Sequence, residues 1–145
     1  MISVQQHDFD VGDQYRRLCE QAGEAGAVVF FVGRVRGGDG AVQALELEHY
    51  PGMTEKALSE IAQQAVTRFD LQDALVIHRH GRLVPGEQIM MVATAARHRR
   101  SAFEAAEFLM DYLKSRAPFW KREITSEGEA WVAAKDEDEA ALERW

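Results

Sequence analysis

Apolar and polar residues follow two different periods along the chain, and each period predicts one kind of secondary structure. Apolar side chains three or four positions apart predict helices over residues 12–22, 54–69 and 101–117. Alternating, β-branched or aromatic runs predict strands. The strands are expected over residues 2–5, 27–32, 42–50, 74–79, 88–94, 119–125 and 129–132. Because hairpins and helical crossovers are mixed in this order, the predicted fold class is α+β, or mixed α/β.

The third predicted helix carries boundary signals at both ends. Ser101 and Glu104 have the spacing of a capping box, so the helix is expected to begin there. Pro118 ends it, because a proline pushes the residue before it toward extended geometry. A strand is therefore expected directly after Pro118.

Length and composition predict one globular domain over residues 1–145. Hydrophobic residues make up 46% of the chain, which is enough for a single buried core. No apolar run approaches the roughly 20 residues that span a bilayer, and the N-terminal residues carry no secretion signal. The single cysteine, Cys19, excludes an internal disulfide and lies on the apolar face of its predicted helix. These features predict a cytoplasmic protein without membrane attachment.

Charge is distributed unevenly. The formal net charge is −7, which argues against a general nucleic-acid binder. Residues 97–122 nevertheless carry seven Lys or Arg against three acids, and the acids are concentrated after them. A basic island in an acidic protein is a candidate anion site, although an ordinary solvated surface has the same composition.

Two of the four lysines, Lys114 and Lys121, stand on either side of Pro118. The break lets a helix end and a strand start bring both side chains to one pocket, and Phe119 and Trp120 between them could shield that pocket from water. A desolvated lysine next to other cations has a lowered pKa and can act as acid, base or nucleophile. The alternative is that Lys114 only complements the helix dipole and Lys121 lies on a surface strand.

Two further groups of basic residues suggest anion binding. Residues 97–100, Arg-His-Arg-Arg, fall between a strand and a helix start, where backbone N–H groups and guanidinium groups can hold a phosphate. Arg34 and Arg36 follow a buried strand and precede a glycine-rich loop.

The histidines do not predict a metal site. His49, His78 and His80 have no third ligand at a metal-like spacing, and the last two are expected to lie on a strand face. Neither a metal nor another cofactor is therefore expected.

Several stretches, taken together and in order, resemble the catalytic (large) subunit of molybdopterin synthase, the MoaE family. The longest and most unusual is Asp111-Tyr112-Leu113-Lys114-Ser115-Arg116-Ala117-Pro118-Phe119-Trp120-Lys121-Arg122-Glu123. The others are Phe31-Val32-Gly33-Arg34-Val35-Arg36, Glu48-His49-Tyr50-Pro51-Gly52-Met53, His78-Arg79-His80-Gly81, Ala96-Arg97-His98-Arg99 and Ala102-Phe103-Glu104-Ala105. The resemblance covers nearly the whole chain.

The resemblance implies an activity, partners and a fold. Sulfur arrives as a thiocarboxylate at the C-terminal Gly-Gly of a small ubiquitin-like carrier subunit. It is inserted into cyclic pyranopterin monophosphate to form the dithiolene of molybdopterin. The family forms a heterotetramer, in which a central homodimer of catalytic subunits binds one carrier on each side. Its fold is an α/β hammerhead with an added small antiparallel sheet.

The resemblance also implies residue roles. The catalytic lysines correspond to Lys114 and Lys121, and a basic residue contributed across the dimer corresponds to Lys135, a lysine where arginine can occur. The substrate-binding positions correspond to Arg34, Val35, Arg36, His98, Arg99, Arg122 and Glu123.

Within that assignment, Arg36, His98 and Arg99 are expected to hold the phosphate. Lys114 would stabilise the acyl oxyanion, and Lys121 would act nearer the pterin. The sequence also allows two alternatives: a non-catalytic module that binds a phosphorylated metabolite or a carrier protein, and RNA binding through residues 97–100.

Overall fold

The computed structural model describes residues 1–133 and 135–145. The helices are α1 (Val11–Gln21), α2 (Met53–Phe69), α3 (Arg99–Arg116) and α4 (Asp136–Ala141), with 3-10 turns at Gly38–Gly40 and Leu142–Arg144. The strands are β1 (Ile2–Gln5), β2 (Ala27–Arg34), β3 (Val42–His49), β4 (Asp73–Arg79), β5 (Gly81–Leu83), β6 (Gln88–Ala96), β7 (Phe119–Thr125) and β8 (Gly128–Trp131).

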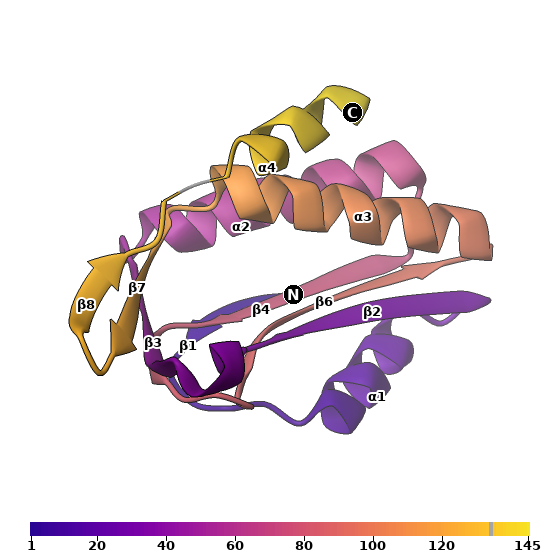
Figure 1. The fold of residues 1–145 in the computed structure, drawn as a ribbon. Helices are drawn as coiled ribbons and strands as arrows, with labels where there is room; N and C mark the ends of the chain where they lie inside the picture. The colour runs from indigo at the N-terminus through magenta and orange to yellow at the C-terminus, as the bar shows by residue number, and fades with distance from the viewer. Residues whose placement is uncertain (134) are drawn as a thin grey trace.

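The larger sheet has the order β1-β4-β6-β2, in which only β1 and β4 are parallel neighbours. Helices α2 and α3 cover one face of this sheet and α1 covers the other (Figure 1). The two central strands are therefore buried on both faces, which explains why β4 and β6 are almost continuously apolar.

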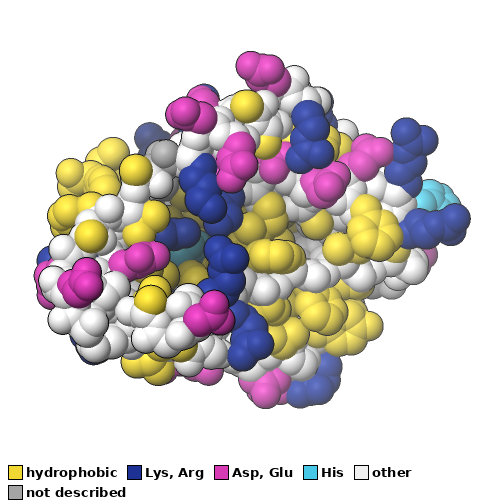
Figure 2. Space-filling view, in the orientation of Figure 1, with side chains coloured by type: hydrophobic (Ala, Val, Ile, Leu, Met, Phe, Trp, Pro, Cys, Tyr) yellow, Lys and Arg dark blue, Asp and Glu magenta, His cyan; other side chains and the backbone are white. Residues whose placement is uncertain are grey.

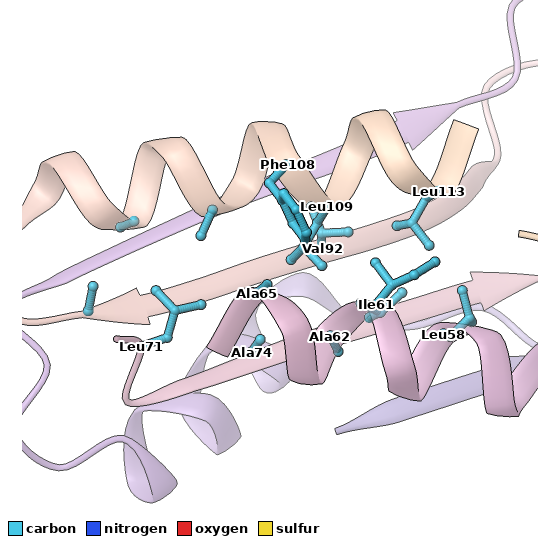
Figure 3. Close-up of a cluster of buried hydrophobic side chains, with 14 of the residues drawn as sticks. Leu58, Ile61, Ala62, Ala65, Leu71, Ala74, Val92, Phe108, Leu109 and Leu113 are labelled. Atoms are coloured by element: carbon cyan, nitrogen blue, oxygen red, sulfur yellow. The ribbon is translucent and has the colours of Figure 1, made fainter. Parts of the chain in front are cut away.

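The main core lies between α2, α3 and the larger sheet (Figure 3). Leu58 and Ile61 of α2 meet Leu109 and Leu113 of α3 above Val92 of β6. These apolar positions recur at helical spacing, so the two helices bury one stripe each. The packing holds α3 in a fixed position over the sheet, with its C-terminal end directed toward the smaller sheet (Figure 1).

The smaller sheet has the order β5-β3-β7-β8, is antiparallel throughout, and stands at one end of the larger sheet (Figure 1). Its inner face is apolar: Leu45 and Leu47 of β3 pack with Val35 and Leu83. Its outer face carries the alternate side chains, which include Glu46, Arg122 and the exposed Trp120, since successive side chains of a strand point to opposite sides.

The α+β fold class and the predicted helices and strands are confirmed, apart from shifts at their ends. The predicted capping box is wrong. The helix begins at Arg99, after His98 with extended backbone, and Ser101 lies inside its first turn. Strand β6 continues to Ala96, two residues beyond its predicted end, so the chain turns into the helix before it reaches Ser101.

The sequence pattern missed β5, α4 and the last 3-10 turn, which are all short. In the part of the chain that the structure describes, no helix is long and apolar enough to cross a membrane.

Candidate functional site

Strand alternation on β7 determines which side chains face the interior. Phe119 and Lys121 share the inner face, opposite His49 and Leu47 of β3. Leu47 is fully buried, so this face meets the core between the two sheets. Lys121 is consequently half-buried instead of lying on an open strand surface.

Lys114 comes to the same place from another element. It lies in the last turn of α3, where a cation is favoured by the helix dipole. The helix ends at Arg116, and the extended backbone at Ala117 directs the chain into β7. The predicted convergence of Lys114 and Lys121 is therefore present in the fold.

The charge of Lys114 acts on Lys121. Burial lowers the pKa of Lys121, and the neighbouring charges of Lys114 and Lys135 lower it further, while the carboxylate of Asp138 opposes them. Lys114 itself is exposed. Figure 2 shows Lys and Arg side chains in a row on this face, beside a hollow.

The C-terminal helix supplies one wall of this site. The Ser115 hydroxyl donates a hydrogen bond of 2.9 Å to the Asp138 backbone carbonyl, and Arg116 forms a 2.7 Å ion pair with Glu139. These contacts hold α4 against the end of α3. They bring Lys135, immediately before α4, to the Lys121 of its own chain, although the resemblance implied a basic residue from across a dimer.

His78 is a site residue that the sequence did not single out for function. It is the next-to-last residue of β4 and is buried. Its ring stacks on Phe119 with ring centroids 3.7 Å apart, and its Nδ1 lies 2.8 Å from the Arg79 carbonyl. Burial lowers its pKa to about 4, helped by the charges of Lys121 and Lys114. Its only sequence signal was its position in the His78-Arg79-His80 stretch, where a strand-face role was expected.

Arg36 and Glu123 line a second hollow of about 450 Å³, together with the glycine loop at residues 37–39. Arg34 is directed elsewhere, because its guanidinium donates to the Gly86 carbonyl at 3.2–3.3 Å. Val35 is buried, and its backbone N–H and C=O both bond to the turn at residues 86–87. Val35 therefore anchors the strand end that carries the two arginines.

Arg122 faces away from the lysines. It pairs with Glu46, lies 3.2 Å from Glu129, and stacks its guanidinium over Trp131 at 5.3 Å. Trp120 shares that outer face, where it packs edge-on against Tyr50 and is 40% exposed. Of Phe119 and Trp120, which were both expected to shield the lysine site from water, only Phe119 lies on the same face of β7 as Lys121.

His98 and Arg99 lie at the opposite end of α3 from Lys114. The 15 residues from Arg99 to Lys114 correspond to about 22 Å of helix. Both side chains are exposed, so within one chain they do not join the lysine site.

The arrangement suits chemistry on anions. The charges of Lys114 and Lys135 both act on half-buried Lys121, and its lowered pKa lets it exchange a proton more readily than an exposed lysine does. An ammonium in a partly desolvated site also stabilises an oxyanion more strongly than it would in water. Among residues 1–133 and 135–145, no three His, Cys, Asp or Glu side chains are grouped as metal ligands.

Comparisons with known proteins agree with this chemistry. Residues 4–116 match the family described as MoaE protein. The molybdopterin synthase catalytic subunit of Cereibacter sphaeroides is 61% identical over 144 residues, covering 99% of each chain. The solved MoaE protein of Burkholderia ambifaria MC40-6 superposes with a TM-score of 0.88 at 52% identity, covering 100% of this chain and 97% of that one.

A more distant fold match is a solved protein–protein complex of subunits 1 and 2 of molybdopterin-converting factor from Helicobacter pylori 26695. Its TM-score is 0.76 at 22% identity, and the match covers 93% of this chain and 90% of that one. The close matches extend over the full length and include the lysine site. The chain belongs to the MoaE family, the catalytic subunits of molybdopterin synthase, which are sulfurtransferases of molybdenum cofactor biosynthesis.

Proposed function

We propose that this chain transfers sulfur from the C-terminal thiocarboxylate of a small ubiquitin-like carrier, ending in Gly-Gly, to cyclic pyranopterin monophosphate. The observation that supports this most strongly is the pairing of Lys114 with the half-buried Lys121 at the junction of the two sheets. Family membership supplies the reaction class, and the lysine pair supplies groups that can carry it out.

Each lysine has a separate task in this proposal. The carrier sulfur attacks a carbon of the pterin side chain and leaves a thioester between carrier and pterin. Water then adds to the thioester carbonyl, the acyl carbon–sulfur bond breaks, and the carrier leaves as a carboxylate. The Lys114 ammonium stabilises the tetrahedral oxyanion of that second step. Lys121 donates a proton to the oxygen that departs from the pterin.

The phosphate of the substrate would bind at the arginine end of the site. Arg36 lines the hollow beside the glycine loop, and its planar guanidinium suits a phosphate. Glu123 on the same hollow would contact a neutral or cationic part of the pterin instead. His98 and Arg99 fit the expected phosphate role only if a second copy of the chain supplies them.

A two-fold homodimer that pairs through β2 would bring His98 and Arg99 of one copy to the lysine site of the other. Strand β2 forms an edge of the larger sheet, and its central residues Phe30 and Phe31 are 48% and 45% exposed. Antiparallel pairing of two such edges places the start of one strand beside the end of the other. The eight residues of β2 span about 24 Å, which matches the roughly 22 Å between Arg99 and Lys114.

We infer that this homodimer binds one carrier subunit at each lysine site, giving a heterotetramer. The two-subunit complex from Helicobacter pylori supports a carrier partner. Each site would then contain Lys114, Lys121 and Lys135 from one chain and His98 and Arg99 from the other.

The direct test is conversion of cyclic pyranopterin monophosphate by a thiocarboxylated carrier in the presence and absence of the purified chain. Dithiolene formation that depends on the chain is expected. If the chain binds carrier and substrate tightly but product forms at the same rate without it, the chain is a binding module and the proposal fails.

A further inference from the structure

The imidazole of His78 lies near enough to Lys121 and Lys114 for both charges to act on it. It comes from the end of β4, whereas the lysines come from β7 and α3. Its ring lies nearly parallel to that of Phe119, with an interplanar angle of 18°. Phe119 and Lys121 share one face of β7, and the charge of Lys121 acts on the His78 ring.

The hydrogen bond of the ring settles which nitrogen carries the proton. Nδ1 lies 2.8 Å from the backbone carbonyl of Arg79, and a carbonyl oxygen can only accept. Nδ1 must therefore be the donor. In the neutral ring, Nε2 then carries a lone pair and acts as an acceptor.

The Arg79 carbonyl is itself held in place. The Arg79 guanidinium donates to the Gln6 carbonyl at 3.0 Å and to the Gln88 carbonyl at 2.9 Å. These bonds tie the end of β4 to two neighbouring segments. The ring of His78 is thus oriented by backbone that has little freedom to move.

The surroundings keep this ring uncharged. Lys121 from β7, Lys114 from α3 and His49 from β3 face it, and each disfavours a second proton. Burial and the charges of Lys114 and Lys135 weaken the preference of Lys121 for its protonated form. An uncharged hydrogen-bond acceptor is therefore the group that suits this cluster of ammonium groups. A lone pair directed at the ammonium would restore part of that preference without adding a second charge to the pocket.

We propose that His78 is a positioning residue for Lys121: its Nε2 accepts a hydrogen bond from the Lys121 ammonium, directly or through one water. The interaction holds Lys121 in its proton-donating form and limits its side chain to one orientation. The importance of that form for turnover rests on the proposed role of Lys121, but the interaction itself can be measured without substrate.

Two substitutions separate this role from a purely structural one. His78→Asn keeps a donor at the Nδ1 position for the Arg79 carbonyl but lacks any group at Nε2. His78→Gln places an amide oxygen near the Nε2 position and restores the acceptor. A structural role predicts that Asn is tolerated at least as well as Gln, whereas the proposal predicts the reverse.

The measurement is the rate at which acetic anhydride acylates Lys121 in the free, folded chain between pH 7 and 10, quantified by peptide mass spectrometry. Only the neutral amine reacts, and exposed Lys56 of α2 provides an internal reference. His78→Asn should raise Lys121 acylation at pH 8 by about three- to tenfold. His78→Gln should stay within about twofold of the parent chain, as should His80→Asn, whose ring faces His49 instead.

Equal acylation of Lys121 in the parent and in His78→Asn would overturn the proposal, as would a folded His78→Gln that behaves like His78→Asn. Failure of the proposed function looks different. In that case Lys121→Ala would still form product at the parent rate, while the effect of His78→Asn on acylation would persist.

Discussion

Lys114 and Lys121 lie together although Pro118 and a change from helix to strand separate them, and the charge of Lys114 contributes to the lowered pKa of Lys121. The inner face of β7 directs Lys121 into the junction of the two sheets, and the last turn of α3 delivers Lys114 to the same point. The lysine site therefore depends on the packing of α3 as much as on the lysines themselves.

Among residues 1–133 and 135–145, Asp138 is the acidic group that opposes the lowering of the Lys121 pKa. Asp138→Asn should therefore lower that pKa further. If Lys121 acts as a proton donor, activity is lost as pH rises through its pKa, so the alkaline limb of the pH–rate profile should move to lower pH. The neighbouring exposed residue provides the control: Glu137→Gln should leave the limb in place. An unchanged profile in Asp138→Asn would contradict the assignment of Lys121 as the donor.

Trp145 packs against Phe69 and Phe108, and its indole N–H donates to Asp111 at 2.7 Å. Trp145→Ala should lower the free energy of unfolding by about 2 kcal/mol, measured by urea denaturation. The same substitution should increase the rate of amide hydrogen exchange in α4, because Trp145 and the last 3-10 turn attach that helix to α2 and α3. Trp131→Ala, at an exposed position, should cost less than about 1 kcal/mol. Equal losses in the two variants would show that the last turn does not anchor α4.

The proposed homodimer places Phe31 at the centre of a paired β2 edge. Phe31→Asp should convert the chain to a monomer in sedimentation-velocity measurements, because it introduces charge into the buried interface. It should also weaken substrate binding, since His98 and Arg99 of the second copy would be lost. Met53→Asp, at an exposed residue that starts α2, should remain dimeric. A dimeric Phe31→Asp variant would exclude β2 as the interface.

The buried imidazole of His78 should make the free energy of unfolding depend on pH in the acid range. Its pKa is 6.5 in an unfolded chain and about 4 in the fold, so between these values the unfolded state binds more protons. Stability should therefore fall as pH decreases from about 6.5 to 4, by roughly 3 kcal/mol from this group. Lys121, Lys114 and His49 face the ring, and all oppose its protonation. Urea denaturation at both pH values should show a smaller drop for His78→Gln, and an equal drop would contradict the burial of an uncharged imidazole.

The sequence was informative where one local signal decides the structure. Pro118 marked the end of α3 within two residues, and the apolar stripes of α2 and α3 located the main core. The convergence of Lys114 and Lys121 followed from that single break. Such features depend on neighbours in sequence, so a pattern can reveal them.

Other parts of the site depend on three-dimensional context that a pattern does not contain. Residues 97–122 read as one basic island, but the 18-residue helix α3 separates its two ends. Arg122 follows Lys121 directly and still faces the other way, because neighbours on a strand point to opposite sides. His78 became part of the site only through its stacking on a residue 41 positions later, Phe119.

The proposed reaction depends above all on Lys114, which stabilises the oxyanion through which the carrier is released. Single-turnover conversion of cyclic pyranopterin monophosphate by thiocarboxylated carrier, measured for Lys114→Ala beside the exposed-lysine control Lys56→Ala, tests it most directly. We expect Lys114→Ala to slow product release by about a hundredfold or more and to accumulate a covalent carrier–pterin thioester, while the control behaves like the parent chain. Product formation by Lys114→Ala at a near-parent rate, with no such intermediate, would show that Lys114 does not stabilise this oxyanion.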